Sequence, residues 1–467
     1  MSILAAFMVP HPPMIVPEIG QGSEAQVAET TRAYEQAADE IAALAPETIV
    51  VTSPHSILYG DYFHISPGKG AKGSFSQFGA GNVKFSVDYD TELVGEICRL
   101  ADGQEFPAGT LGERDKALDH GTMVPLWFIE RAYEKAGASK DYKLIRVGLS
   151  GLPLTDHYRM GQIIRAAAEN AGRRTVIVAS GDLSHKLQDY GPYGFAKEGP
   201  EYDARIMDVC GRGAFGELFD FSESFCDRAA ECGHRSFVIM AGAFDGMAVE
   251  AKALSHQDVT GVGYGVCTFY PAGEDESRRF LAQYLKQTEE ELARRRGQED
   301  PYVKLARQSL ESYILNRRVI DIPDDVPEEM LHAKAGAFVS IHKDGALRGC
   351  IGTTGPTTDC VAREIINNAI SASTRDPRFS AIGPEELPRL EISVDVLGEP
   401  EDIASEDELD VKRYGVIVSS VDKRGLLLPD LDGIDTVQQQ IDIAKQKAGI
   451  HRFESVKLQR FEVVRHE

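Results

Sequence analysis

The sequence of 467 residues has no run of about 18 apolar residues, so we expect no transmembrane helix. Its seven cysteines are odd in number, scattered and without a Cys-x-x-Cys pair, which argues against a disulfide framework and favours a reducing compartment. Positively charged residues are outnumbered, since the sequence has 50 Lys and Arg and 73 Asp and Glu. The net charge of -23 argues against nucleic acid and anionic membrane surfaces as partners. The N-terminus lacks a basic segment, so we expect no signal peptide and a cytoplasmic location.

The length predicts two or more domains, because single hydrophobic cores stop growing near roughly 250–300 residues. Strand-like and helix-like stretches alternate over residues 1–271, which predicts an α/β domain with a mostly parallel sheet flanked by helices. Residues 272–299 are highly charged and predict a solvated helical linker. Residues 300–467 mix strands and helices in no regular order, which predicts an α+β domain.

The order of elements near the N-terminus predicts a βαβ unit. A strand at 4–10, a helix at 24–45 and a strand at 48–53 follow one another, so the two strands are expected to be parallel neighbours. Residues 60–86 are rich in Gly, Ser and Phe. There we expect a strand at 61–66 and then a mobile loop, which shapes a pocket beside the site.

Polar side chains follow three predicted strands of the first domain. His11 and His55 each come after an apolar run and each lie beside proline, and Ser180-Gly-Asp182 with His185 ends a third run. Open α/β sheets bind ligands at the carboxyl ends of their strands. Because adjacent parallel strands lie about 4.8 Å apart, the imidazoles of His11 and His55 are expected to reach one metal ion.

A third, anionic ligand is expected in Ala230-Glu-Cys-Gly-His234. Glu231 would complete a site of two histidines and one carboxylate, which leaves three positions on Fe(II) for a bidentate substrate and dioxygen. Cys232 is the alternative, because a thiolate binds Zn(II) or Cu(I) more readily. His185 and His120 closely follow acidic residues and are candidates for proton transfer. Such chemistry requires no organic cofactor.

Residues 1–270 resemble the class III extradiol ring-cleavage dioxygenases of the LigB type. The resemblance rests on stretches that match in order and spacing: His11-Pro-Pro, Ser53-Pro-His55-Ser, Leu118-Asp-His120-Gly-Thr-Met-Val-Pro-Leu126, Ser180-Gly-Asp-Leu-Ser-His185 and Glu231-Cys-Gly. It implies that His11, His55 and Glu231 bind non-haem Fe(II). It also implies that His185 is the acid/base residue, that His120 contacts the substrate, and that a catecholic substrate reacts with dioxygen. Self-association is common among such proteins, so a homo-oligomer is also implied.

The same residues also resemble the Memo family, which shares this fold and metal-site residues. The late ligand of that family is a cysteine in a Cys-Gly-Arg context, which Cys232-Gly-His234 resembles. This leaves two alternatives open: a non-catalytic metal-binding or interaction protein, and a zinc-dependent hydrolase that uses the same strand-end ligands.

The second domain carries a cysteine flanked by glycines in Leu347-Arg-Gly-Cys-Ile-Gly352, which follows a hairpin turn at residues 343–345. Glycines let backbone approach a ligand closely, and Arg348 could lower the thiol pKa or hold a carboxylate. Nucleophilic or acyl chemistry is one interpretation, and a small buried hydrophobic Cys350 is the other. The candidate residues are Arg348, Cys350, Arg375, Asp376 and Glu391.

Residues 300–467 resemble the AMMECR family, whose fold is α+β. The matching stretches are Leu347-Arg-Gly-Cys-Ile-Gly352, Ser373-Thr-Arg-Asp-Pro-Arg-Phe379, Leu390-Glu-Ile-Ser-Val394 and Gly425-Leu-Leu-Leu-Pro429. A fused chain of this kind resembles protein A of the AmmeMemoRadiSam system. That resemblance implies a radical SAM protein as a pathway partner.

Overall fold

The computed structural model describes residues 2–343, 345–420, 422–431 and 433–467. The chain divides into two compact units, Met1–Lys286 and Gln287–Glu467, and the division falls inside α9 (Phe280–Gln298). The segment predicted as a helical linker is therefore a helix over most of its length. Within the described residues, no helix combines the length and apolar character needed to cross a membrane.

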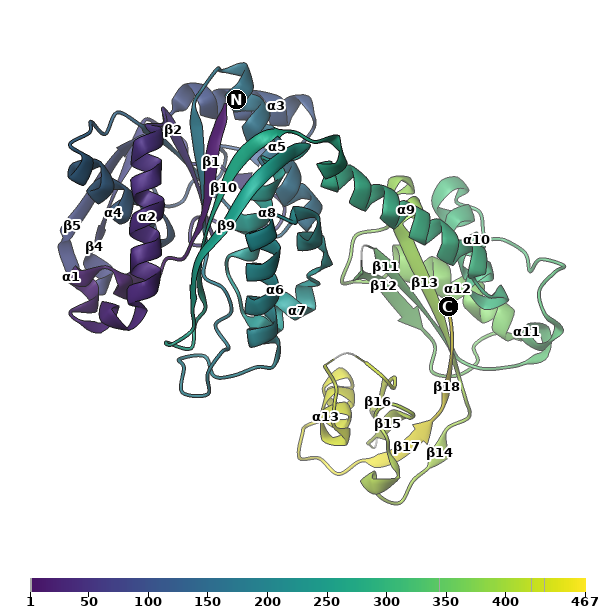
Figure 1. Ribbon diagram of the computed structural model, residues 1–467. Coiled ribbons are helices and arrows are strands. Elements are labelled where there is room, and N and C mark those ends of the chain that lie inside the picture. Colours follow the sequence, from purple (N-terminus) through teal and green to yellow (C-terminus); the bar gives the residue numbers. More distant parts are fainter. Residues whose placement is uncertain (1, 344, 421, 432) are drawn as a thin grey trace. The chain divides into compact units, whose positions relative to one another are not determined.

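The first unit is built on a six-stranded sheet with strand order β7-β2-β8-β1-β10-β9 (Figure 1). The first four strands in that order are parallel, and β10 and β9 run antiparallel. This confirms the predicted α/β class. The strands are β1 (Ile3–Val9), β2 (Thr48–Ser53), β7 (Lys143–Gly148), β8 (Thr175–Ser180), β9 (Met247–Gln257) and β10 (Tyr264–Glu274).

Helices cover both faces of this sheet. Alternate residues of one strand enter different cores, so that Phe7 of β1 packs with α2 and α4 while Met8 packs with α5 and α8. Strands buried on both faces must be apolar throughout, which explains the Val- and Ile-rich runs. The helices are α1 (Pro17–Gly20), α2 (Ala28–Leu44), α3 (Thr91–Gly103), α4 (His120–Ala136), α5 (Leu154–Asn170), α6 (Glu198–Arg212), α7 (Glu223–Ala229) and α8 (His234–Gly242).

Two predictions about the first unit are wrong. β8 lies between β1 and β2, so the two strands of the predicted βαβ unit are parallel, as predicted, but they are not neighbours. Residues 70–88 form an antiparallel hairpin of β4 (Gly70–Phe75) and β5 (Ala80–Asp88) where a mobile loop was expected. The predicted strand at 61–66 is reduced to β3 (Phe63–His64), which pairs with β6 (Ala108–Gly109). The apolar side chains of Ala71, Phe75 and Phe85 enter the core, and these contacts order the hairpin.

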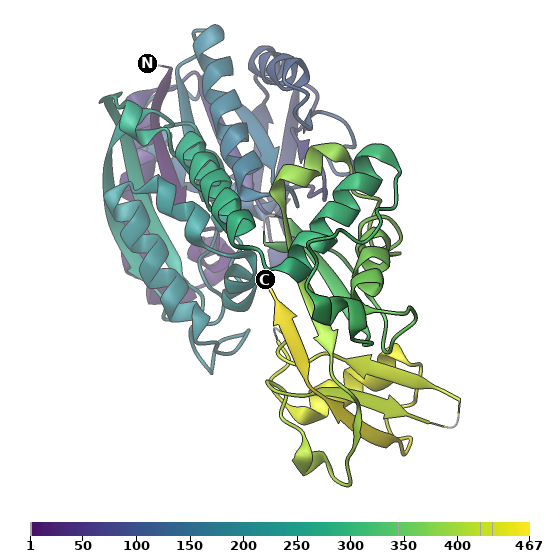
Figure 2. The ribbon, with the colours of Figure 1, turned by 90° about the vertical axis from the view of Figure 1, so that its right-hand side faces the viewer.

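The second unit contains two antiparallel sheets, with strand orders β12-β11-β13-β18 and β14-β17-β15-β16 (Figure 2). Helices α10 and α12 pack on the first sheet, and α13 packs on the second, which confirms the α+β class. The strands are β11 (Ala337–Lys343), β12 (Ala346–Gly352), β13 (Leu390–Leu397), β14 (Glu401–Asp402), β15 (Gly415–Ser419), β16 (Arg424–Leu427), β17 (Lys457–Phe461) and β18 (Val463–His466). The helices are α10 (Pro301–Asn316), α11 (Glu328–His332), α12 (Val361–Thr374) and α13 (Val437–Lys447).

Candidate metal centre

Two strand-end histidines meet above the carboxyl end of the strand between them. His11 follows β1 and His55 follows β2, and their Nε2 atoms lie 3.0 Å apart. With β8 between them, β1 and β2 lie roughly two strand spacings of about 4.8 Å from each other. The residues that follow each strand therefore fold over the end of β8, where Ser180 contacts His11. The two histidines meet as the sequence predicts, but not because their strands are adjacent, since β8 separates β1 from β2.

Ser180 fixes the orientation and tautomer of the His11 ring. The Ser180 hydroxyl donates to the carbonyl oxygen of Gly121 at 2.6 Å, and its Oγ lies 2.9 Å from His11 Nδ1. A hydroxyl has only one proton to donate, so Ser180 must accept from a protonated Nδ1. The lone pair of His11 is then on Nε2, which faces His55. Such an outer partner is typical of histidines that bind metals.

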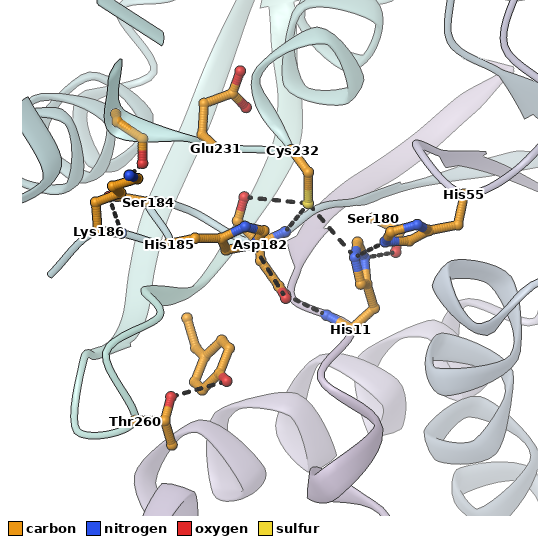
Figure 3. Close-up of polar contacts among 12 residues, drawn as sticks. His11, His55, Ser180, Asp182, Ser184, His185, Lys186, Glu231, Cys232 and Thr260 are labelled. Atoms are coloured by element: carbon orange, nitrogen blue, oxygen red, sulfur yellow. Dashed lines mark hydrogen bonds and ion pairs between the residues drawn. The ribbon is translucent and has the colours of Figure 1, made fainter. Parts of the chain in front are cut away.

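Cys232 is the third donor that the structure brings to the two histidines (Figure 3). Its Sγ lies 3.6 Å from His11 Nε2. Two atoms that bind one ion at about 2.0–2.3 Å lie within about 4.6 Å of each other. The distance from Sγ to His11 Nε2 and the distance between the two Nε2 atoms are both shorter than this. The backbone N–H of Asp182 donates to the same sulfur at 3.3 Å, which favours the thiolate form.

The close approach of two glycines positions Cys232. A Cβ on Gly181 would lie 2.1 Å from Cα of Gly233, so the backbone after β8 touches the backbone that follows Cys232. Any larger residue at position 181 would push the two segments apart. This contact sets the distance between the sulfur and the imidazoles.

Gly181→Ala is therefore expected to destabilise the protein by about 3 kcal/mol, because the added methyl group has no space. Gly95→Ala in α3 is the matched control, since its Cβ would meet no atom within 4 Å. This control is expected to stabilise by about 0.5–1 kcal/mol, as alanine does inside helices. Urea unfolding followed by circular dichroism measures both. A Gly181→Ala variant as stable as the parent would show that the contact is not tight.

Glu231, the first choice for the third ligand, lies apart from the two imidazoles (Figure 3). Its carboxylate accepts a hydrogen bond of 2.6 Å from the backbone N–H of His234, at the start of α8. Acidic side chains stabilise helix N-termini in this way. Burial raises the pKa of Glu231 to about 7. The structure thus gathers the alternative ligand, Cys232, with His11 and His55.

Asp182 and His185 lie beside Cys232, and Asp182 also contacts the backbone of His11. One carboxylate oxygen of Asp182 accepts from the backbone N–H of His11 at 2.8 Å, and the other lies 4.0 Å from Nε2 of His185. Asp182, His185 and Cys232 form a second group of donors close enough to share an ion. The His185 ring stacks on Tyr193 with a centroid separation of 5.0 Å.

His120 faces the pair from the first turn of α4. Its ring lies 3.9 Å from that of His55 and 5.4 Å from that of His11, measured between centroids. Asp119 caps this helix, because its carboxylate accepts from the backbone N–H of Thr122 at 3.0 Å. His55 and His120 both line a cavity of about 1240 Å³, one wall of which is the β4–β5 hairpin.

The surroundings keep the imidazoles unprotonated. Burial, together with the neighbouring imidazoles, lowers the pKa of His11 and of His120 to about 3. Desolvation also lowers the pKa of His55 and His185. Burial raises the pKa of Asp182 to about 6 and that of the Cys232 thiol well above its usual range. Neutral imidazoles are ready metal ligands, and an ion would displace the thiol proton. The donor set therefore fits a divalent metal.

The second-unit candidates are only partly brought together. Asp376 accepts a hydrogen bond of 2.9 Å from the backbone N–H of Cys350. Glu391 lines the same cavity as Cys350 and pairs with Arg295. Arg348 instead binds Glu386 at 3.0 Å. Arg348 and Arg375 are not among the described residues that line this cavity.

Sequence reasoning missed three functional neighbours. The sequence pattern indicates Ser180 only as the end of a strand, and it does not single out Arg378 or Ser340. Arg378 donates to the carbonyl oxygen of Cys350 at 3.2 Å, and the Ser340 hydroxyl donates to the sulfur of Cys350, also at 3.2 Å. Ser340 could have been found, because the two residues pair in a predicted hairpin. No local signal distinguished Arg378 from Arg375.

Comparison with known proteins identifies both parts of the chain. Residues 5–267 match the family model of the catalytic LigB subunit of aromatic ring-opening dioxygenase, and residues 303–466 match that of AMMECR1. Protein CA_C1420 of Clostridium acetobutylicum is 40% identical over the full length of both chains. A protein of Thermotoga maritima is 50% identical over 36% of this chain and 98% of its own length.

One solved structure, the uncharacterized protein PH0010 from Pyrococcus horikoshii, is 31% identical. It covers 35% of this chain and 88% of its own, with a TM-score of 0.33. The family models and the full-length relative decide the assignment. The chain belongs to the LigB dioxygenase family in its first unit, and its second unit is an AMMECR1 domain.

Proposed function

We propose that the first unit is a non-haem, Fe(II)-dependent oxidoreductase that opens the ring of a catecholic substrate with dioxygen. The observation that carries the proposal is the convergence of His11, His55 and Cys232 beside two further histidines, at the edge of a large cavity. His11, His55 and Cys232 would hold the ion, and Cys232 would take the position first expected for Glu231. Bound there, Fe(II) would supply Lewis acidity and one-electron chemistry for the reaction of diol and dioxygen.

His185 is the residue that would remove a proton from a substrate hydroxyl. Its lowered pKa leaves it neutral at neutral pH, so Nε2 can accept a proton. Asp182 lies beside that nitrogen and would stabilise the imidazolium once it forms. Tyr193 stacks on the ring and limits its rotation. The proton could return to the product from the same nitrogen.

The cavity beside His55 and His120 would hold the aromatic ring. Phe78 contacts His120 with a centroid separation of 5.5 Å and also lines the cavity, so it offers an apolar edge near the metal ligands. The volume of this cavity, about 1240 Å³, is above the usual range of volumes for ligand pockets. Two exposed lysines of the hairpin, Lys72 and Lys84, line the same cavity. These favour a substrate with an acidic substituent.

A common pathway for the two units also belongs to this proposal. Fusion of the LigB-type unit with an AMMECR1 domain in one chain supports a shared pathway. A radical SAM protein and a second copy of the chain are the partners that we propose.

The proposal is tested with protein that is purified without oxygen and reconstituted with Fe(II). We expect about one Fe(II) per chain and oxygen uptake that depends on an added catechol. The matched control is the same protein loaded with Zn(II), which has no redox chemistry and should consume no oxygen. Stoichiometric zinc after purification, with no oxygen uptake by the Fe(II) form on any catechol tested, would favour a zinc hydrolase or a non-catalytic protein instead.

A further inference from the structure

The second unit contains a cavity of about 1550 Å³ that the proposed ring-opening chemistry does not use. All of its lining residues lie between Leu292 and Glu467, so it belongs to this unit alone. We call it the Cys350 cavity, because the half-buried thiol of Cys350 is part of its wall. It is large enough to admit a small molecule.

The charge of the Cys350 cavity is opposite to that of its surroundings. Residues 287–467 carry 24 Lys and Arg against 34 Asp and Glu, so the unit is acidic. The cavity lining carries seven Lys and Arg and only five Asp and Glu. A cleft lined by an excess of one charge raises the local concentration of ligands with the opposite charge. The lining therefore favours an anion.

Two buried guanidinium N–H groups in the lining have no hydrogen-bond acceptor. Arg307 is 9% exposed, and it binds Glu299 and the carbonyl oxygen of Leu390 through Nε and Nη2. Its Nη1 has no hydrogen-bond partner, and Glu311 lies 3.8 Å from that nitrogen. Nε of Arg296 is also buried without a partner. Glu311 leaves Nη1 of Arg307 in an ion pair without a hydrogen bond, and Nε of Arg296 has no hydrogen bond, so both N–H groups can still take a hydrogen-bond acceptor.

Cys350 is held in place by contacts from three side chains, one to its thiol and two to its backbone. Ser340 donates to Sγ, Asp376 accepts from the backbone N–H, and Arg378 donates to the backbone oxygen. Arg378 also pairs with Asp376 at 2.7 Å, which links two of these contacts. The sulfur is therefore fixed at the wall of a basic cavity, next to the space that a ligand would fill.

We propose that the Cys350 cavity binds a small anionic molecule, whose carboxylate or phosphate group is held by Arg296 and Arg307 and whose body contacts the Cys350 thiol. This site is independent of the metal centre, so its failure would leave the proposed ring-opening function unaffected.

Alkylation of the full-length protein by iodoacetate and iodoacetamide tests the proposal. In both reactions the sulfur forms a bond to the methylene carbon, iodide leaves with the electron pair of the C–I bond, and the thiol proton goes to solvent. The reagents differ in charge, since only iodoacetate is an anion. Peptide mass spectrometry gives the rate at Cys350 and at Cys98, a half-buried thiol of the first unit. We expect the iodoacetate-to-iodoacetamide rate ratio to be at least about tenfold higher at Cys350.

Inorganic phosphate and acetate are the probes for binding. At constant ionic strength, at least one of them should slow the reaction of Cys350 with uncharged iodoacetamide severalfold and leave Cys98 unaffected. Protection by phosphate alone or by acetate alone identifies which anionic group the site takes. Equal rate ratios at the two thiols, together with no protection by either anion, would overturn the proposal.

Arg296→Gln removes one of the two proposed anion-binding side chains. It should lower the iodoacetate-to-iodoacetamide rate ratio at Cys350 toward the ratio at Cys98. Because Arg296 also donates to the carbonyl oxygen of Leu387, a second variant avoids a loss of folding. Arg424→Gln with Lys447→Gln removes two exposed cations of the lining and should lower the ratio in the same way. Lys334→Gln is the control, since exposed Lys334 lies outside the lining. A Lys334→Gln ratio that falls as far as the others would show a general charge effect and contradict the site.

Discussion

Replacing Cys232 with serine is expected to weaken metal binding by at least about 100-fold. Loss of a partner outside the ligand shell already costs about 10- to 100-fold in affinity, and Cys232 is placed to be a direct ligand. Serine keeps the size of the side chain but stays protonated at neutral pH, so it offers no anionic donor. Oxygen uptake should fall in proportion to the metal lost.

Glu231→Gln is the matched control at the neighbouring position. Its amide oxygen can still accept from the backbone N–H of His234, so the start of α8 should be preserved. We expect this variant to keep its metal. Competition with a chromophoric chelator gives the affinities, and elemental analysis gives the stoichiometry. If Glu231→Gln lost the metal and Cys232→Ser kept it, the carboxylate would be the ligand and the segment between α7 and α8 would have to rearrange on metal binding.

His185→Gln is expected to lower turnover by about 10²- to 10⁴-fold while the metal stays bound, because glutamine cannot accept the substrate proton. The parent enzyme should lose activity toward acid pH as His185 takes up a proton. Since desolvation lowers the pKa of His185, this loss should occur below pH 6.5, the ordinary value for histidine. The residual activity of the His185→Gln variant should not show this loss toward acid pH.

Tyr193→Phe is the control for His185→Gln, because it keeps an aromatic ring against the imidazole and removes only an exposed hydroxyl. Its turnover should stay within a few-fold of the parent enzyme. Steady-state oxygen uptake against pH, together with metal content, measures both variants. If His185→Gln released the metal, His185 would be a ligand, as the second donor group with Asp182 and Cys232 allows.

The sequence was most informative where one short segment determines the structure. Apolar runs that end at His11, His55 and His185 predicted strands that deliver polar groups to one edge of a sheet, because a strand and the residue after it are local features. The apolar patterns of residues 301–316, 337–343 and 390–397 predict a helix and two strands, and these are α10, β11 and β13 in the structure. Their alternating or helical apolar patterns are strong.

The choice between Glu231 and Cys232 could not be made in this way. Both residues occupy one short connection, and which of them faces the histidines depends on how that connection meets the backbone after β8. The contact between Gly181 and Gly233 determines this, and it joins segments 52 residues apart. The position of β8 between β1 and β2 escaped prediction for the same reason, since strand order depends on packing between distant segments.

The place of β1 in the sheet also determines when the metal centre can form during synthesis. β1 emerges from the ribosome first, but its two neighbours, β8 and β10, begin at Thr175 and Tyr264. The sulfur of Cys232 lies 221 positions after His11. Contacts across such separations form slowly, because the intervening chain must be ordered first. A nascent chain therefore exposes His11 and His55 well before it can offer the third donor, so the proposed metal would be held by all three donors only after Cys232 has been synthesised and β8 has joined the sheet.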